Sequence, residues 1–231
     1  MRTTLKIAIL PALLLALASA AYASTVTLGS YGTNVNSTGY SGPVTPFSNS
    51  ALEYDGYSTS STPLSPNTRT SYDVTATSAS STWAAPITGT SWVSDVYNGS
   101  SGNNGQSDGY YDYTSTFTAT AGTYSGTFKI AADDTVEVIL DGTTIVSFGS
   151  GSYGSDETVP LTDFLLGSTN TLTIIDEQGP NENNTPLGVD FAGTLNSAAT
   201  PEPSSLLLLG TGLLGVAFVA FRRAKASALT F

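Results

Sequence analysis

The sequence predicts an all-β fold: an antiparallel β-sandwich ectodomain between an N-terminal signal helix and a C-terminal single transmembrane helix. The central part of the 231-residue chain is rich in Thr, Ser, Gly, Tyr and Val, which favours short strands joined by turns. Apolar and polar residues alternate from Tyr110 onward, and each end of the chain contains one long apolar run. We therefore expect a signal peptide at 1–23, a sandwich at 24–197 and a C-terminal tail at 198–231.

The N-terminal segment has the three parts of an export signal. Arg2 and Lys6 supply positive charge, residues 7–18 are apolar, and Ala-Tyr-Ala at 21–23 provides the small residues of a cleavage site. A second membrane anchor is the alternative interpretation, but the apolar stretch is too short to span a bilayer comfortably. We expect signal peptidase to cleave after residue 23 and to leave Ser24 as the first residue.

The ectodomain is strongly acidic. Of the 18 Asp and Glu residues in the chain, all but Glu202 lie between residues 24 and 200, where the only basic residues are Arg69 and Lys129. This balance argues against nucleic acid and anionic lipid as partners, because both require basic patches. The chain has no Cys and no His. Their absence removes His-based triads, thiol nucleophiles and ordinary zinc sites.

Turn residues and alternation predict the order of the strands. We expect a first strand near 25–28 and then a long surface loop over 30–50, where Gly and Pro recur in a polar setting. From residue 110 to 148, the alternation predicts an antiparallel meander of four strands. Within it, Asp141-Gly142 predicts a tight hairpin, because Asp-Gly favours the positive φ values of a type I′ turn.

The segment 161–172 predicts a short helical turn, a Gly suited to a left-handed helix end, and a strand that re-enters at Asn170. A closing strand is expected within 187–195. The helical turn, the Gly167-x-x-Asn170 spacing and the Asp-Gly hairpin upstream resemble the signature of galactose-binding-like jelly rolls. The resemblance implies that the sandwich is a jelly roll.

The C-terminal tail contains a charged triplet made of Pro201, Glu202 and Pro203, followed by the uncharged run 206–221. At ~1.5 Å rise per residue this run covers ~24 Å, somewhat under a ~30 Å hydrocarbon core. We expect a transmembrane helix at about 205–221, because flanking serines or local thinning would close the gap. A buried core helix is the alternative, but a short helix that is apolar all round needs lipid or a large core.

Three basic residues follow the apolar run directly. They are Arg222, Arg223 and Lys225. By the positive-inside rule they act as a membrane stop, hold the C-terminus in the cytoplasm and place the ectodomain outside. Together with the Pro-Glu-Pro triplet, these features resemble the PEP-CTERM sorting tail of exported bacterial proteins, also labelled an ice-binding protein C-terminal domain. The resemblance implies recognition by an exosortase, a membrane cysteine peptidase, with cleavage near the triplet and transfer to the cell surface or extracellular matrix.

Asp133 and Asp134 form the best candidate binding site. With Gly122, Phe128 and the Asp-Gly hairpin, they resemble the sugar-binding sandwich of protective-antigen-type adhesin modules. In that family an Asp-Asp pair holds Ca²⁺, which in turn holds sugar hydroxyls, although Thr135 stands where those modules usually have Gly. Ca²⁺ takes six to eight oxygen ligands, so two carboxylates are only part of a site.

Further candidate ligands lie in an acidic stretch that we expect to form a loop. They are Asp176, Glu177 and Glu182. Asp141 is excluded, because a strand of ~3.3 Å per residue places it ~20 Å from Asp134. The alternative interpretation of the Asp-Asp pair is a solvated turn whose side chains cap backbone N–H groups.

Two interpretations are open for Trp83 and Trp92: a sugar-stacking platform, or packing in the core, which we favour. A two-carboxylate glycosidase is the enzyme alternative. The sequence singles out no pair of carboxylates for that chemistry, so we expect no enzymatic activity.

The expected function is therefore that of an exported surface or matrix protein with a structural or binding role and no required cofactor. The alternative is a Ca²⁺-dependent carbohydrate-binding module that contacts exopolysaccharide. Signal peptidase, an exosortase and the membrane are the expected partners. The expected location is the inner membrane before processing and the cell surface or extracellular space afterwards.

Overall fold

The computed structural model describes residues 23–34, 47–74, 83–96, 106–181, 185–198 and 203–227. The strands are β1 (Thr25–Gly29), β2 (Glu53–Ser58), β3 (Tyr72–Val74), β4 (Trp92–Ser94), β5 (Gly109–Thr118), β6 (Gly122–Asp133), β7 (Thr135–Leu140), β8 (Thr143–Ser150), β9 (Glu157–Leu166), β10 (Thr169–Gln178) and β11 (Gly188–Ser197). One helix, α3 (Pro203–Ser227), follows them among the described residues. The strands belong to a compact unit, Ser24–Ala198.

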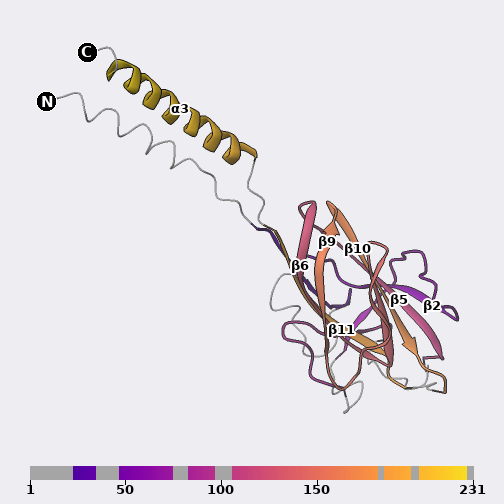
Figure 1. Cartoon of the computed structure of the whole chain (residues 1–231). Coiled ribbons are helices and arrows are strands. Elements are labelled where there is room, and N and C mark those ends of the chain that lie inside the picture. The colour runs from indigo at the N-terminus through magenta and orange to yellow at the C-terminus, as the bar shows by residue number, and fades with distance from the viewer. Residues whose placement is uncertain are drawn as a thin grey trace. The chain divides into compact units, whose positions relative to one another are not determined.

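The strands form two sheets that face each other (Figure 1). A six-stranded sheet has the order β3-β4-β11-β6-β9, with β1 also paired to β11, and a five-stranded sheet has the order β2-β5-β10-β7-β8. Every pairing between these named strands is antiparallel. The prediction of an all-β antiparallel sandwich is confirmed. Successive strands from β5 to β11 cross repeatedly between the sheets, which is the connectivity of a jelly roll.

The two sheets share one hydrophobic core. Leu172 and Ile174 on β10, and Phe128 and Ile130 on β6, are fully buried at alternate positions. Phe128 also stacks on Phe191 of β11, with ring centroids 5.4 Å apart. Fully burying one such side chain contributes about 1.5–3 kcal/mol. A one-residue slip would expose every core residue of the slipped strand, so this pattern fixes the strand registers.

The predicted four-strand meander over 110–148 is wrong. The strands exist, but β5 pairs with β2 and β10, and β6 pairs with β11 and β9. Only β7 and β8 pair as neighbours. Alternation of apolar and polar residues shows that a strand buries one face, but strands in both sheets of a sandwich do so. It therefore did not reveal that the chain crosses between sheets at 119–121.

The hairpin between β7 and β8 is confirmed. Asp141 has φ 48° and Gly142 has φ 78°, the two positive values of a type I′ turn. The strands at 25–29 and 188–197 also confirm the predicted first and closing strands.

The predicted helical turn near 161–166 is wrong, because these residues belong to β9 and pair with β6. The register shifts between Tyr124 and Gly126, opposite Asp163, whose φ is 52°. Such a bulge breaks the two-residue alternation. The apolar residues on either side of it then have a spacing that imitates a helix.

The structure describes only part of the two ends of the chain. Residues 1–22, which include most of the predicted signal peptide, lie outside the described residues, as do Pro201 and Glu202. Pro203 begins α3, and Arg222 and Arg223 lie near its end. Among the described residues, no helix is both long and apolar enough to cross a membrane. The predicted transmembrane span at about 205–221 is therefore not confirmed.

Candidate functional site: the acidic end of the sandwich

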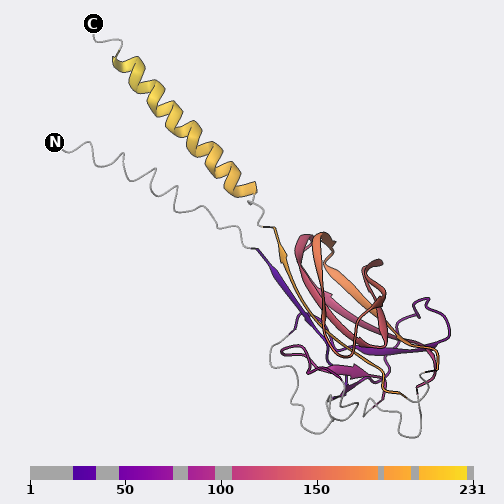
Figure 2. The ribbon, with the colours of Figure 1, turned by 60° about the horizontal axis from the view of Figure 1, so that its bottom comes forward.

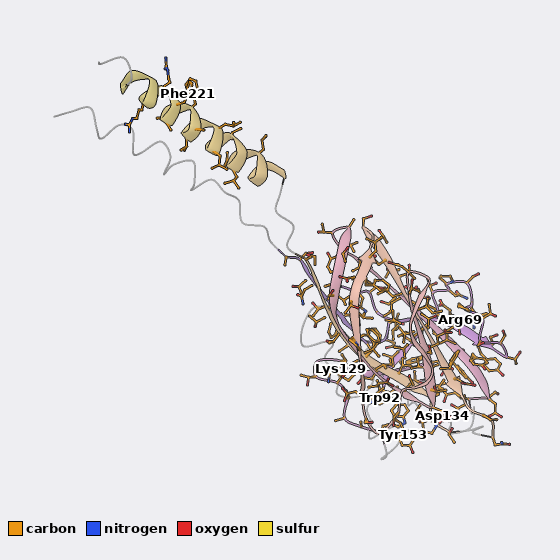
Figure 3. The ribbon with its side chains drawn as sticks, in the orientation of Figure 1. Arg69, Trp92, Lys129, Asp134, Tyr153 and Phe221 are labelled. Atoms are coloured by element: carbon orange, nitrogen blue, oxygen red, sulfur yellow. The ribbon has the colours of Figure 1, made fainter. Side chains whose placement is uncertain are left out.

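Asp133 and Asp134 lie where β6 ends and the turn into β7 begins, and the peptide bond between them is cis. The Trp83 indole N–H donates to Asp133 Oδ2 at 2.7 Å, and the Gly179 N–H donates to Asp134 Oδ2 at 2.9 Å. One oxygen of each carboxylate is thus engaged inside the protein. We call this end of the sandwich, where Figure 3 labels Asp134 and Trp92, the acidic end.

Asp176 lies in β10, not in the predicted loop, because β10 continues to Gln178. Its side chain is fully buried and points into the sandwich, as does that of Ile174 two residues earlier. Among the described residues, neither carboxylate oxygen of Asp176 has a hydrogen-bond partner. Burial raises the pKa of Asp176 well above its ordinary value, and the charges of Asp133 and Asp134 raise it further.

The remaining candidates are Glu177, Glu182 and Asp141. Glu177 follows Asp176 on the opposite face of β10, where burial and the Glu177 charge raise the pKa of Tyr110. Glu182 is outside the described residues. Asp141 is at the far end of β7, where its Oδ1 accepts the Thr171 N–H at 2.8 Å. Of the predicted ligands that the structure describes, the fold brings Asp133, Asp134 and Asp176 to the acidic end, together with the Glu177 backbone, whose carbonyl accepts the Asp134 N–H at 3.3 Å.

Sequence reasoning missed three polar residues at the acidic end: Asp95, Gln106 and Tyr113. Asp95 directly follows β4, and Gln106 Nε2 donates to its Oδ1. Tyr113 is fully buried on β5, and its hydroxyl has no partner among the described residues. Burial raises the pKa values of Asp95 and Tyr113, and the charges of Asp95 and Asp176 add to the rise at Tyr113. The alternation of β5 placed Tyr113 inside, but gave no sign of charged neighbours.

Among the described residues, neither basic residue of the ectodomain forms an ion pair with a carboxylate of this cluster. Lys129 forms an ion pair with Asp156, with Nζ 2.6 Å from Oδ2. Arg69 lies over the ring of Tyr54, 6.0 Å from its centroid. The acidic end thus has no described cationic side chain that offsets its charge.

Ca²⁺ binding at the Asp-Asp pair remains a prediction. Within the described parts of the chain, no group of three or more acidic side chains is arranged to hold a metal ion. A Ca²⁺ ion at Asp133 and Asp134 would need backbone carbonyls, amide oxygens and water for most of its ligands.

Trp83 and Trp92 are core residues, so the sugar-platform interpretation is wrong. They are 6% and 0% exposed, and their ring centroids are 4.4 Å apart. They pack with Val74 and Ala131, and the Trp92 indole N–H donates to the Ala84 carbonyl at 3.0 Å. Their polar atoms are used for internal hydrogen bonds, as is usual for buried indoles.

A hollow among the described residues lies away from the acidic end. It has a volume of about 320 Å³ and an open mouth, and its lining includes Ser24, Thr118 and Tyr124. These residues lie at the opposite ends of β5 and β6 from the acidic end. Its lining contains no carboxylate, and Ser24 Oγ and Tyr124 Oη share a hydrogen bond of 2.6 Å. We assign no chemistry to it.

A second acidic pair lies on the outer face of the five-stranded sheet. Asp112 is fully buried there, and its Oδ2 accepts the Leu64 N–H at 2.6 Å. Asp55 Oδ1 accepts the Asn67 N–H at 2.5 Å, and its Oδ2 accepts the Thr114 hydroxyl. Burial raises the pKa of Asp112 to about 6, against the lowering effect of the Leu64 N–H, and the Asp55 charge adds to the rise. The two carboxylates thus fasten the loop after β2 to the sheet.

Comparison with known proteins finds one family match. A PEP-CTERM protein-sorting motif covers residues 199–224, which confirms the predicted sorting tail. No curated protein matches the chain.

Among solved structures, the chain is similar to a GH26-CBM35 β-(1,4)-mannanase from Podospora anserina, with 17% identity, a TM-score of 0.33, and coverage of 58% of this chain and 26% of that one. It is also similar to a β-glucosidase from Kluyveromyces marxianus in complex with glucose, at 16% identity and TM-score 0.24, covering 41% of this chain and 11% of that one. The selenomethionine-labelled form of that β-glucosidase gives 16% identity, TM-score 0.25, and coverage of 52% and 14%. The chain thus spans about a quarter or less of these proteins, and similarities this partial support no inference about its activity.

Proposed function

We propose that this chain is an exosortase substrate whose sandwich is the mature cargo, displayed at the cell surface or in the extracellular matrix. The observation that supports the proposal is the PEP-CTERM motif at residues 199–224, which begins two residues after β11 ends at Ser197. Such a motif implies export and processing by the membrane-bound peptidase. The role proposed for the sandwich is structural or binding, without catalysis.

The arrangement of the two terminal strands supports this assignment. β1 and β11 lie side by side, with Thr25 opposite Asn196 (Figure 2). The Ser24 N–H donates to Ser197 Oγ at 2.8 Å, and the Ser197 N–H donates to the Ser24 carbonyl at 2.9 Å. Cleavage before Ser24 and after Ala198 would leave every strand of the sandwich intact. Both processing points can therefore be cut without loss of the folded cargo.

Replacement of Pro201, Glu202 and Pro203 by alanine in the native host tests the proposal. We expect the variant to keep the mass of the unprocessed tail and to be depleted from the cell surface and medium. Glu157→Gln, an exposed change on β9, serves as the matched control and should be processed like wild type. Unchanged processing of the triplet variant would contradict exosortase recognition.

A second proposed function is Ca²⁺-dependent carbohydrate binding at the acidic end. The observation that favours it is the adjacent pair Asp133 and Asp134 with the buried Asp176 beside them. Calorimetry of the purified chain with Ca²⁺, followed by a glycan array with and without chelator, tests it. Binding of a glycan only in the presence of Ca²⁺ would support it. If no glycan binds with or without chelator, this second proposed function is wrong.

A further inference from the structure

Buried oxygen atoms without partners are concentrated inside the acidic end. Within the described residues, both carboxylate oxygens of Asp176, the Tyr113 hydroxyl and Gln106 Oε1 have no hydrogen-bond partner. These side chains are 0%, 0% and 3% exposed. A buried polar atom without a hydrogen-bond partner loses its contact with water and gains nothing in return, and the loss is larger for a charged group. A cluster of such atoms therefore indicates a bound species that satisfies them together.

The two sheets supply these atoms to one region. Asp176 on β10 is opposite Tyr111 on β5, so Tyr113 is its diagonal neighbour on the same inner face. Asp95 comes from the end of β4 in the other sheet and is bound to Gln106. The charges of Asp95 and Asp176 act on each other and on the Tyr113 hydroxyl. The two carboxylates, which come from opposite sheets, therefore lie near enough for each to raise the cost of burying the other.

A proton alone satisfies this region poorly. Protonation of Asp176 and the Tyr113 O–H would provide at most two donors, and Asp95 would still be a carboxylate inside the protein without a basic partner. A cation can bind all of these oxygens at once, and it removes the electrostatic cost of burying two carboxylates without a basic partner.

We infer that the acidic end holds a structural Ca²⁺ ion between the sheets, with Asp176 and Asp95 as carboxylate ligands and Gln106 Oε1 and the Tyr113 hydroxyl as neutral oxygen ligands. Two carboxylates balance a divalent charge, and hard oxygen ligands suit Ca²⁺. Ca²⁺ is favoured over Mg²⁺, because Mg²⁺ demands near-ideal octahedral geometry and dehydrates reluctantly. This inner site differs from the turn at Asp133 and Asp134, and it rests on neither proposed function.

Removal and return of Ca²⁺ test the inference on the full chain in mild detergent. After treatment with chelator, added Ca²⁺ should raise Tm by several degrees, since a ligand that binds only the folded state stabilises it. Tb³⁺ should replace Ca²⁺ and show luminescence excited through the neighbouring tyrosines. Metal analysis of untreated protein should give one Ca²⁺ per chain.

Variants locate the ion. Asp176→Asn and Asp95→Asn should each weaken Ca²⁺ affinity at least 100-fold, whereas Asp134→Asn should weaken it less than 10-fold. Asp163→Asn, an exposed change on β9, is the matched control and should bind like wild type. Without metal, the Tm of Asp176→Asn should equal or exceed that of the chelated wild type, because the substitution removes an uncompensated buried charge. Such a Tm would show that the variant is folded.

Three results would overturn the inference. One is a wild-type Tm that does not respond to Ca²⁺ after chelation. Another is a full Ca²⁺ response in both Asp176→Asn and Asp95→Asn. The third is loss of the response in Asp134→Asn alone, which would place the ion at the turn.

Discussion

Substitution of Asp112 by Asn should flatten the dependence of stability on pH. The pKa of this carboxyl is raised from 3.8 to about 6 in the folded chain, so the folded state binds its proton more tightly than the unfolded state. Stability from this group is therefore fully present below pH ~4 and is lost as pH rises through ~6. At 1.36 kcal/mol per pKa unit the loss is at most about 3 kcal/mol. We expect about 2 kcal/mol, because the hydrogen bond to Leu64 is only partly buried and solvent screens part of the charge.

The Asn variant should keep the loop contact, since its side-chain carbonyl can accept the Leu64 N–H in place of Asp112 Oδ2. It should therefore be more stable than wild type at pH 7.5 and nearly equal to it at pH 4.5. Burial also raises the pKa values of Asp55, Asp73 and Asp190, so the wild-type curve alone does not isolate one group. The difference between variant and wild type does.

Urea denaturation followed by fluorescence of the buried Trp83 and Trp92 measures this difference between pH 4.5 and 7.5. Asp163→Asn on β9 controls for loss of a negative charge. Its left-handed backbone tolerates Asn. Parallel stability curves for Asp112→Asn and wild type would refute the reasoning.

Two further substitutions test the packing and the surface charges. A Cβ added at Gly126 would lie 1.9 Å from the Thr194 carbonyl oxygen, so Gly126→Ala should destabilise the sandwich by about 2–4 kcal/mol. A Cβ added at Gly122 would have its nearest atom 4.0 Å away, so Gly122→Ala should change stability little. Equal urea midpoints for the two would contradict the close β6–β11 contact. Lys129→Ala removes the ion pair with Asp156, whose partners are 46% and 38% exposed, so the loss should be below about 1 kcal/mol and vanish in high salt. A larger loss that persists in salt would show that the pair is more than a surface contact.

The sequence predicted correctly the features that depend on residues close together in the chain. The Asp141-Gly142 turn depends on two residues that tolerate positive φ, and the structure has both values. The sorting tail depends on composition and position, and residues 199–224 match the motif. The sandwich itself followed from alternation, because each strand buries one face.

Which strands pair, and to which sheet each strand belongs, depends on residues far apart in the sequence. The β5–β6 connection has the alternation of a hairpin, yet β5 pairs with β10, a strand more than fifty residues later in the chain. The turn between β5 and β6 does not determine which strands β5 and β6 pair with. In β9, Asp163 occupies a left-handed conformation that shifts the phase of alternation, and a single bulge was enough to imitate a helical spacing.

The candidate site shows the same limit. Asp176 belongs to an acidic run with Gly and Pro, which is typical of a loop, but pairing with both β5 and β7 keeps it in a strand. Its burial depends on the opposite sheet, which contributes Asp95. That juxtaposition comes from the tertiary fold, and no spacing along the chain predicts it.

The most direct test of the sorting account is the intact mass, with both terminal sequences, of the protein recovered from the surface or medium of its native host. We predict a chain that begins at Ser24 and ends near the Pro-Glu-Pro triplet, so that helix α3 is absent. A recovered chain that still contains residues 206–225 would contradict processing at the sorting motif.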